Sequence, residues 1–305
     1  MIHIQLEELR DGFNRMCYII NEEELNTIHL ALCLEKPLLV SGPAGVGKTE
    51  LAKVLSAILG ARLIRLQCHE GLDESKSLYD WNIQRQLINI HLSSRTKDSE
   101  KIEEDIFSLD YILQRPLLQA ITQKEQVLLL IDEIDRSDRD FEAFLLELLS
   151  DYQVSIPEIG TIKAVCKPVV VITNSGERDL SEALRRRCVF LYLDNPTIEE
   201  EACILRARVP DVLETLNENI AIAVAMARDK GSQLGFGNVQ LLDWARVLLM
   251  LDADRFKKDY VVQCMEQLAW NRENIIAIME ESSGHMTNSS EDRAGKAAGN
   301  GEIKD

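Results

Sequence analysis

Residues 37–50 read Pro-Leu-Leu-Val-Ser-Gly-Pro-Ala-Gly-Val-Gly-Lys-Thr-Glu, and the rest of the chain can be placed around them. The aliphatic run at 38–40 predicts a short buried strand, and apolar residues recur at helical spacing from Leu51 to Ile58. Between them, residues 42–49 match G-x-x-x-x-G-K-[ST], a loop whose backbone N–H groups hold phosphate. A glycine-rich turn can match this pattern by chance, but a strand, loop and helix in succession favour a nucleotide-binding site.

The pattern predicts how this loop would hold its ligand. We expect the nucleotide to be bound by Gly42, Pro43, Ala44, Gly45, Val46, Gly47, Lys48, Thr49 and Glu50. The ammonium group of Lys48 can reach the β- and γ-phosphates, and the hydroxyl of Thr49 can ligate Mg²⁺. The start of the following helix adds partial positive charge beside the phosphates. The predicted cofactors are therefore ATP and Mg²⁺.

A second aliphatic strand ends in two acids. Residues 127–131, Val-Leu-Leu-Leu-Ile, predict a strand buried on both faces of a parallel sheet, and Asp132 and Glu133 follow it. Open α/β sheets bind ligands at the carboxyl ends of their strands. We interpret Asp132 as the carboxylate that holds Mg²⁺ through a water molecule, and Glu133 as the base that orients and deprotonates the attacking water. The alternative is a solvated acidic loop, which the phosphate-binding loop elsewhere in the chain makes less favourable.

Apolar periodicity predicts the remaining elements of the first two thirds of the chain. Asn21 and Glu24 form a capping-box pattern at the start of a helix. The helices are expected at 21–35, at 106–122 with a break near Pro116, at 141–149 and at 180–187. The strands are expected at 62–68, 86–92, 168–174 and 188–193, with a β-hairpin at about 153–166. The polar segment 93–105 is expected to be an exposed loop.

Beyond residue 194 the pattern predicts helices only. Asn195 and Pro196 have the residue types preferred at a helix N-cap and at the first helical position. Apolar stripes continue to Met279 and indicate a small helical domain. Residues 283–305 are rich in Gly, Ser, Asn and Ala, which predicts a disordered tail.

Composition narrows the classes of function. The net charge of −17 disfavours nonspecific binding to nucleic acid or anionic lipid, although a local basic pore in a ring stays open. Apolar runs stay well below 18 residues and the first residues are acidic, so we expect a cytoplasmic protein without a membrane span or secretory signal. The seven cysteines are scattered without a C-x-x-C motif, so we expect mostly buried thiols rather than disulfides or zinc ligands. The adjacent Cys68 and His69 could be metal ligands, but the sequence has no second such pair, so we expect them to have a structural role.

These motifs, in this order, resemble those of the AAA+ ATPases over about residues 15–280. Within that superfamily the chain resembles the MoxR group, because of the insertion CHEGLDESKSLYDWNIQRQL at 68–87 and the run FLLELLSDYQVSIPEIGTI at 144–162. It is most similar to the CoxD-like subgroup. The resemblance implies an α/β three-layer sandwich with a five-stranded parallel sheet, in which the strand ending at Asn174 lies between the phosphate-loop strand and the Asp132 strand.

The resemblance also implies the domain organisation. Residues 1–194 would be the AAA+ core, with an insertion at about 69–105 and the hairpin already described. Residues 195–282 would form an all-α lid, and 283–305 the tail. The insertion would present a partner-facing or pore-facing surface through Tyr79 and Trp81, unless both aromatic rings pack onto the core.

Further catalytic residues are implied by the resemblance. Relatives carry Ser-Asn or Asn-Asn where this chain has Thr-Asn-Ser-Gly at 173–176. We choose Asn174 as sensor 1, because its amide can hold both water and a γ-phosphate oxygen whereas Ser175 could reach only one. The arginine finger aligns best with Arg187, and next with Arg186. One or two of the three arginines at 185–187 could instead form surface ion pairs.

The sensor 2 position departs from the family pattern. Many MoxR proteins carry Ser-Pro-Arg where this chain has Asn-Val-Gln at 238–240. Arg246 lies about two turns further on and either substitutes for the missing arginine or is simply solvated.

The activity implied by the resemblance is ATP hydrolysis in a ring, usually a hexamer. MoxR-type proteins are chaperone-like motors that remodel or mature a partner, here including a client metalloenzyme, often beside a protein with a von Willebrand factor A domain. One alternative is a nucleic-acid loader or helicase, which the charge and the lack of an appended DNA-binding segment disfavour. Another is a nucleotide-gated binding module with little turnover. Asp132 and Glu133 argue against that module, but the missing sensor 2 arginine keeps it open.

Overall fold

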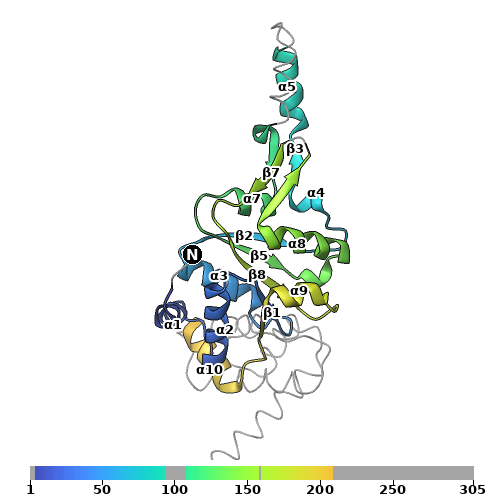
Figure 1. Ribbon diagram of the computed structural model, residues 1–305. Coiled ribbons are helices and arrows are strands. Elements are labelled where there is room, and N and C mark those ends of the chain that lie inside the picture. Colours follow the sequence, from blue (N-terminus) through green and yellow to red (C-terminus); the bar gives the residue numbers. More distant parts are fainter. Residues whose placement is uncertain (1–3, 94–107, 158, 209–305) are drawn as a thin grey trace, which may run out of the picture. The chain divides into compact units, whose positions relative to one another are not determined.

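The computed structural model describes residues 4–93, 108–157 and 159–208 (Figure 1). The chain divides into two compact units, Met1–Gly42 with Gly47–Leu193 and Pro43–Val46 with Asp194–Asp305. Several predicted segments lie outside the described residues. They are the predicted loop from residue 94 to 105, the lid helices beyond residue 208, the sensor 2 segment at 238–240 with Arg246, and the tail at 283–305.

The described chain alternates helices and strands. The strands are β1 (Leu38–Ser41), β2 (Arg62–Gln67), β3 (Tyr79–Trp81), β4 (Ile112–Gln114), β5 (Val127–Asp132), β6 (Gln153–Ile156), β7 (Gly160–Lys163), β8 (Val169–Asn174) and β9 (Val189–Tyr192). The α-helices are α1 (Leu6–Arg15), α2 (Glu22–Cys33), α3 (Lys48–Ile58), α4 (Glu74–Ser77), α5 (Ile83–Ser93), α7 (Pro116–Thr122), α8 (Arg139–Asp151), α9 (Glu182–Arg187) and α10 (Ile198–Arg208). Two short 3₁₀ helices are η1 (Leu109–Tyr111) and η2 (Ile134–Arg136).

A five-stranded parallel sheet organises the first unit. Its strand order is β2-β5-β8-β1-β9. Strand β8, which ends at Asn174, therefore lies between the phosphate-loop strand β1 and strand β5, which ends at Asp132. This confirms the predicted order. Because the strands are parallel, their carboxyl ends share one edge of the sheet, and ligands of open α/β sheets bind at that edge.

Helices cover both faces of this sheet (Figure 1). All six residues of β5 are buried, as predicted for a strand with a helical layer on each side. Leu129 and Ile131 face a cluster that α7 and α8 complete, while α3 packs against β2, β5 and β8. Helix α1 packs onto α3, where a Cβ on Gly12 would lie 2.7 Å from the side chain of Ile58. A larger residue at Gly12 would force Ile58 to move.

Two predictions for the segment before β5 are wrong. Residues 86–92, predicted as a strand, lie in helix α5, where the apolar residues Ile83, Leu87 and Ile90 follow helical spacing. A short apolar run such as this one fits the period of a strand and that of a helix, so its pattern alone does not distinguish the two structures. The helix predicted from 106 to 122 covers only α7 among the described residues, because Pro116 begins the helix and keeps the preceding residue extended.

Two further expectations need correction. Helix α10 begins after Thr197, not after Asn195. The Thr197 hydroxyl accepts from the Glu200 amide at 3.2 Å, and the Glu200 carboxylate accepts from the Thr197 amide at 2.8 Å. This reciprocal capping box satisfies more backbone donors than the predicted cap. The cysteines are also less buried than expected: Cys68 is buried, but Cys17, Cys33 and Cys203 are exposed because they lie in a turn and on helix surfaces.

No helix within the described ranges is both long and apolar enough to cross a membrane.

Candidate active site

The phosphate-binding loop leads directly into α3. Gly47 has φ +112°, a left-handed conformation that strains other residues, and it caps the helix that Lys48 begins. Lys48 is buried, and its Nζ donates to the carbonyl of Gly42 at 2.7 Å. Burial lowers the pKa of Lys48, although the carboxylates of Asp135, Glu133 and Asp132 act in the opposite direction. The Lys48 ammonium group therefore lies in the electrostatic field of three carboxylates.

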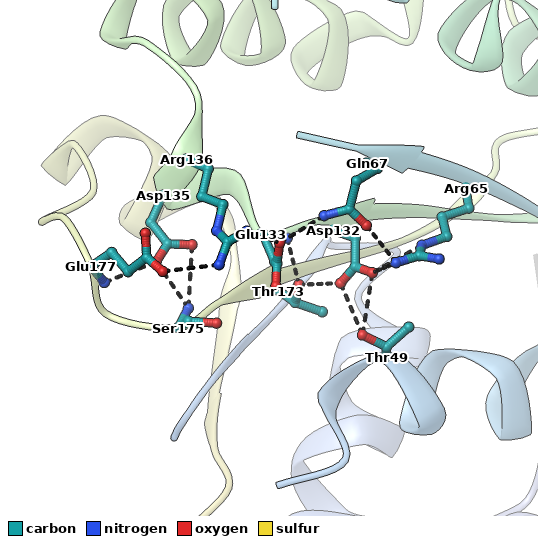
Figure 2. A network of polar contacts seen from close by, with 10 residues as sticks. All are labelled: Thr49, Arg65, Gln67, Asp132, Glu133, Asp135, Arg136, Thr173, Ser175 and Glu177. Carbon is teal, nitrogen blue, oxygen red and sulfur yellow. Dashed lines mark hydrogen bonds and ion pairs between the residues drawn. The ribbon is translucent and has the colours of Figure 1, made fainter. Parts of the chain in front are cut away.

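Asp132, the last residue of β5, accepts hydrogen bonds from three elements (Figure 2). Its Oδ1 accepts from the Thr49 hydroxyl of α3 at 3.0 Å and from the Thr173 hydroxyl of β8 at 2.6 Å. Its Oδ2 accepts from Arg65 of β2, from Nε at 2.9 Å and from Nη2 at 2.6 Å. The residue is 1% exposed. Burying a carboxylate without partners is costly, and these donors satisfy both of its oxygens and fix its orientation.

Glu133 extends from the same strand end in a strained backbone conformation. Its φ of 58° and ψ of 54° are left-handed, which is uncommon for a residue with a side chain and is typical of active sites. Its amide donates to the Thr173 hydroxyl at 2.8 Å, which holds the turn. Its carboxylate accepts from Gln67 Nε2 at 2.8 Å and lies 3.2 Å from Arg136 Nη1. Glu133 is thus held at the sheet edge with a partly exposed carboxylate.

The segment after β5 is bound to the connection between β8 and α9. Asp135 accepts from the amides of Ser175, at 3.1 Å, and Glu177, at 2.9 Å. Arg136 bridges two carboxylates, because its Nη2 also lies 3.1 Å from Glu177 Oε1 while Nη1 contacts Glu133 (Figure 2). The position of the β8–α9 connection is therefore coupled to that of Glu133.

A buried ion pair holds α9 against α8. Glu142, which is buried, pairs with Arg178 at 2.5 Å and accepts from the Ser181 amide at 2.9 Å. Ser181 is the N-cap of α9, so this contact fixes where the arginine-bearing helix begins.

The remaining predicted residues lie at two different places. Asn174 ends β8 at the candidate site, where its Nδ2 donates to Ser41 Oγ at 3.3 Å. Arg186 pairs with Glu182 at 2.6 Å on the surface of α9. Arg187, the last residue of α9, is exposed and forms no ion pair within 4–93, 108–157 and 159–208. Because β9 begins beside Pro37, Arg187 lies at the amino end of the sheet, opposite the phosphate-binding loop.

Sequence reasoning missed three residues of this site: Thr173, Arg65 and Gln67. Thr173 directly precedes the predicted sensor, and its hydroxyl contacts both Asp132 and Glu133. The two β2 residues stand two positions apart and so share one face of the strand. Their polarity was a usable signal, but the pairing of Gln67 with Asp132 depends on the register between β2 and β5, which the sequence did not give.

We expect Thr173→Val to lower ATP turnover about 10- to 100-fold, the usual cost of removing a group that orients site residues. Valine keeps the volume but not the hydroxyl that joins Asp132 to the Glu133 amide. Nucleotide affinity should change much less, because Thr173 is not part of the phosphate-binding loop. Steady-state phosphate release and equilibrium binding separate the two effects. The Thr173→Ser variant keeps a hydroxyl and should recover activity; an inactive Ser variant would contradict this role.

The predicted role of Tyr79 and Trp81 in a partner-facing or pore-facing surface is not supported by their positions, whereas the structural role predicted for Cys68 is. Both aromatic rings are half-buried, pack against the core, and contact each other edge to face at 6.0 Å between centroids. This packing favours the alternative that both rings pack onto the core and do not face a partner or a pore. Burial raises the pKa of Cys68 to about 12, so its thiol stays protonated, as the structural reading expects. The described residues contain no group of three or more His, Cys, Asp or Glu that could hold a metal.

A glycine-rich loop entering a helix, beside a strand that ends in a buried aspartate and a strained glutamate, defines a P-loop nucleotide-binding domain. Residues 37–188 match the family model described as AAA domain, dynein-related subfamily. Residues 37–188 therefore match an AAA domain, the class that the motifs predicted. The finer placement in the MoxR group is not established by this match.

Two curated relatives each match more than half of this chain. The Holliday junction branch migration complex subunit RuvB of Fervidobacterium nodosum is 26% identical over 247 residues, which cover 73% of this chain and 59% of that protein. An uncharacterized protein of Staphylococcus aureus is 30% identical over 168 residues, covering 53% and 56%. The chain thus spans a little over half the length of these curated relatives. The solved Thermotoga maritima RuvB Holliday junction branch migration motor shares the fold, with a TM-score of 0.50, 20% identity, and coverage of 84% of this chain and 72% of that one.

Proposed function

We propose that this chain is an ATP-hydrolysing motor whose reaction takes place at the carboxyl edge of the central sheet. The observation that carries the proposal is the contact of the Thr49 hydroxyl, at the end of the phosphate-binding loop, with Asp132, the last residue of β5, which Glu133 directly follows. In this proposal Lys48 and the loop amides bind the phosphates of ATP. Glu133 orients and deprotonates the attacking water, and Asn174 holds that water against the γ-phosphate.

The residues present fit Mg²⁺. Magnesium prefers hard oxygen ligands and usually binds one or two protein groups together with substrate phosphates. The Thr49 hydroxyl and the Asp132 carboxylate lie 3.0 Å apart and supply such oxygens. When bound there, Mg²⁺ would partly neutralise the negative charge of the phosphates.

We also propose a ring in which Arg187 completes the nucleotide site of the neighbouring subunit, with residues 195–282 as a helical lid. Its exposure and its lack of an ion pair within the described part of the chain leave its guanidinium available to another subunit. A hexamer is the expected ring.

The substrate we favour is a protein, remodelled as MoxR-type motors do, including a metalloenzyme client presented beside a von Willebrand factor A domain protein. Helix α5 supports this choice, because Ile83, Leu87 and Ile90 are exposed at i, i+4 and i+7. Exposed apolar residues grouped in this way are typical of protein-binding surfaces. The net charge of −17 is also unfavourable for a nucleic-acid surface.

A DNA motor is the second candidate, because a relative that matches 73% of this chain is a subunit of a Holliday junction branch migration complex. It predicts that duplex or junction DNA stimulates ATP hydrolysis, and that the stimulation falls steeply with salt. A protein remodeller predicts no such effect.

Trapping the ATP-bound state tests the choice between these substrates. We expect the Glu133→Gln variant, charged with ATP, to retain a protein client after nuclease treatment, because it binds ATP without hydrolysing it. Lys48→Ala is the matched control and should retain nothing, since it lacks the phosphate ligand. The purified client should then stimulate ATP hydrolysis by the unmodified chain, and Ile83→Ser with Leu87→Ser should remove that stimulation while leaving basal hydrolysis intact. Stimulation by DNA alone, lost at high salt, would contradict the protein-remodelling proposal.

A further inference from the structure

Strand β2 places a cation directly on the carboxylate that the proposed function gives to Mg²⁺. Arg65 donates from both Nε and Nη2 to Asp132 Oδ2, at 2.9 and 2.6 Å (Figure 2). Two donors on one oxygen are charge-assisted and fix the guanidinium in place. The other oxygen, Oδ1, accepts from the hydroxyls of Thr49 and Thr173. The carboxylate therefore already has a counter-charge supplied by its own chain.

A metal ion held by the Thr49 hydroxyl would face both oxygens of Asp132. The hydroxyl lies 3.0 Å from Oδ1 and 3.2 Å from Oδ2, so it is almost equally close to both oxygens of the carboxylate. Arg65 occupies one of these two oxygens. A divalent cation and a guanidinium at the same buried carboxylate would repel each other, and weak solvent screening strengthens that repulsion.

The two partners differ in how easily they can separate. The Asp132 side chain is 2% exposed and cannot move to water, whereas the Arg65 side chain is 49% exposed at the end of a flexible stem. Release of Arg65 into solvent is therefore the less costly response to an arriving cation. We propose that Arg65 and Mg²⁺ compete for the Asp132 carboxylate, so that Arg65 sets how strongly nucleotide binding depends on Mg²⁺.

The competition for Asp132 would also affect Glu133, because Gln67 connects Arg65 to Glu133. Nη2 of Arg65 also donates to Gln67 Oε1, and Gln67 Nε2 donates to Glu133 Oε2 at 2.8 Å. Arg65 thus holds the amide that holds the proposed base. When Arg65 leaves Asp132, Gln67 loses the donor that orients its amide group. Arg65 acts in this account as a positioning residue for the metal and for Glu133, not as a catalytic residue.

The inference rests on the proposed nucleotide-binding function and is tested by binding, not by turnover. The probe is a fluorescent, non-hydrolysable ATP analogue, titrated into the full chain with EDTA and again with saturating Mg²⁺. The ratio of the two dissociation constants measures how much Mg²⁺ strengthens binding. Arg65→Met keeps the aliphatic stem without the charge and should raise this ratio about three- to tenfold, as expected for loss of a partly exposed ion pair with two charge-assisted bonds. Arg65→Lys should raise it less.

Arg62 offers a matched control on the same strand. It is exposed, lies three residues earlier on the opposite face of β2, and pairs in register with Val127 at the far end of β5. Arg62→Met therefore makes the same charge change away from Asp132 and should leave the ratio unchanged. Thermal unfolding shows whether each variant is folded. If Arg65→Met is not, Arg65→Lys carries the test.

The possible results separate the inference from the function on which it rests. A ratio in the folded Arg65 variants that equals or falls below that of the unmodified chain would overturn the competition, and a lower ratio would show that Arg65 supports metal binding. Failure of the unmodified chain to bind the analogue under either condition would overturn the nucleotide-binding function itself, and the inference with it.

Discussion

Lys48→Ala is expected to abolish ATP binding, whereas Glu133→Gln is expected to preserve binding and stop turnover. Lys48 is buried at the start of α3, where its Nζ donates to the Gly42 carbonyl, so it would meet the phosphates in the ground state. Glu133 lies at the end of β5 and would act only on the attacking water. Losing a charge-assisted contact to phosphate weakens affinity by about 100-fold or more, so almost no binding should remain at nucleotide concentrations near the dissociation constant of the unmodified chain.

Equilibrium titration with a fluorescent ATP analogue distinguishes these two roles. Glu133→Gln should bind within a few-fold of the unmodified chain, because glutamine keeps the shape of the side chain and can still contact Gln67. Circular dichroism and thermal unfolding provide the control for folding. Equal loss of binding in both folded variants would contradict the division of roles between Lys48 and Glu133.

Arg187→Ala is expected to reduce ATP hydrolysis by about 10³- to 10⁵-fold, the contribution of an arginine finger in nucleotide hydrolases. The finger acts by neutralising charge on the transferring phosphoryl group. Arg187 closes α9 at the amino end of the sheet, whereas the phosphate-binding loop follows the carboxyl end of β1. In the proposed ring, this position would direct Arg187 toward a neighbouring subunit and away from its own site. Arg186→Ala is the matched control, since Arg186 pairs with Glu182 on the helix surface.

Mixed rings test whether Arg187 acts between subunits. A Lys48→Ala subunit still offers Arg187, and an Arg187→Ala subunit still offers an intact phosphate-binding loop. Combined in one ring, the two should regain part of the activity that each lacks alone. Mixed rings confirmed by native mass spectrometry that stay as inactive as either parent would exclude Arg187 as the finger, and Arg186 would then be the next candidate.

The sheet and the centre of the site could be predicted from the sequence because their signals are local. Five aliphatic residues before Asp132 can only be buried on both faces, and the phosphate-binding loop fixes its own strand and helix. The order of β8 between β1 and β5 followed from the resemblance to AAA+ proteins and is confirmed. Each of these patterns fits one secondary structure only, so distant contacts did not change the element that it predicted.

The errors arise where local patterns are ambiguous or where distant residues decide. Residues 86–92 alternate and also fit a helix, and α5 forms where no strand is available to pair with it among the described residues. Arg65 and Gln67 entered the site only through the register of β2 with β5. The left-handed conformation of Glu133 depends on the Thr173 hydroxyl from another strand. None of these contacts has a signature within its own segment.

Phosphate release from Mg-ATP by the full chain is the measurement that decides whether this protein is a motor. We expect steady-state release that requires Mg²⁺, that is lost in Glu133→Gln although this variant still binds the nucleotide, and that falls in the Arg187→Ala variant. Tight ATP binding by the unmodified chain, with no more phosphate released than by Glu133→Gln, would contradict this expectation and would show a nucleotide-gated binding module in place of a motor.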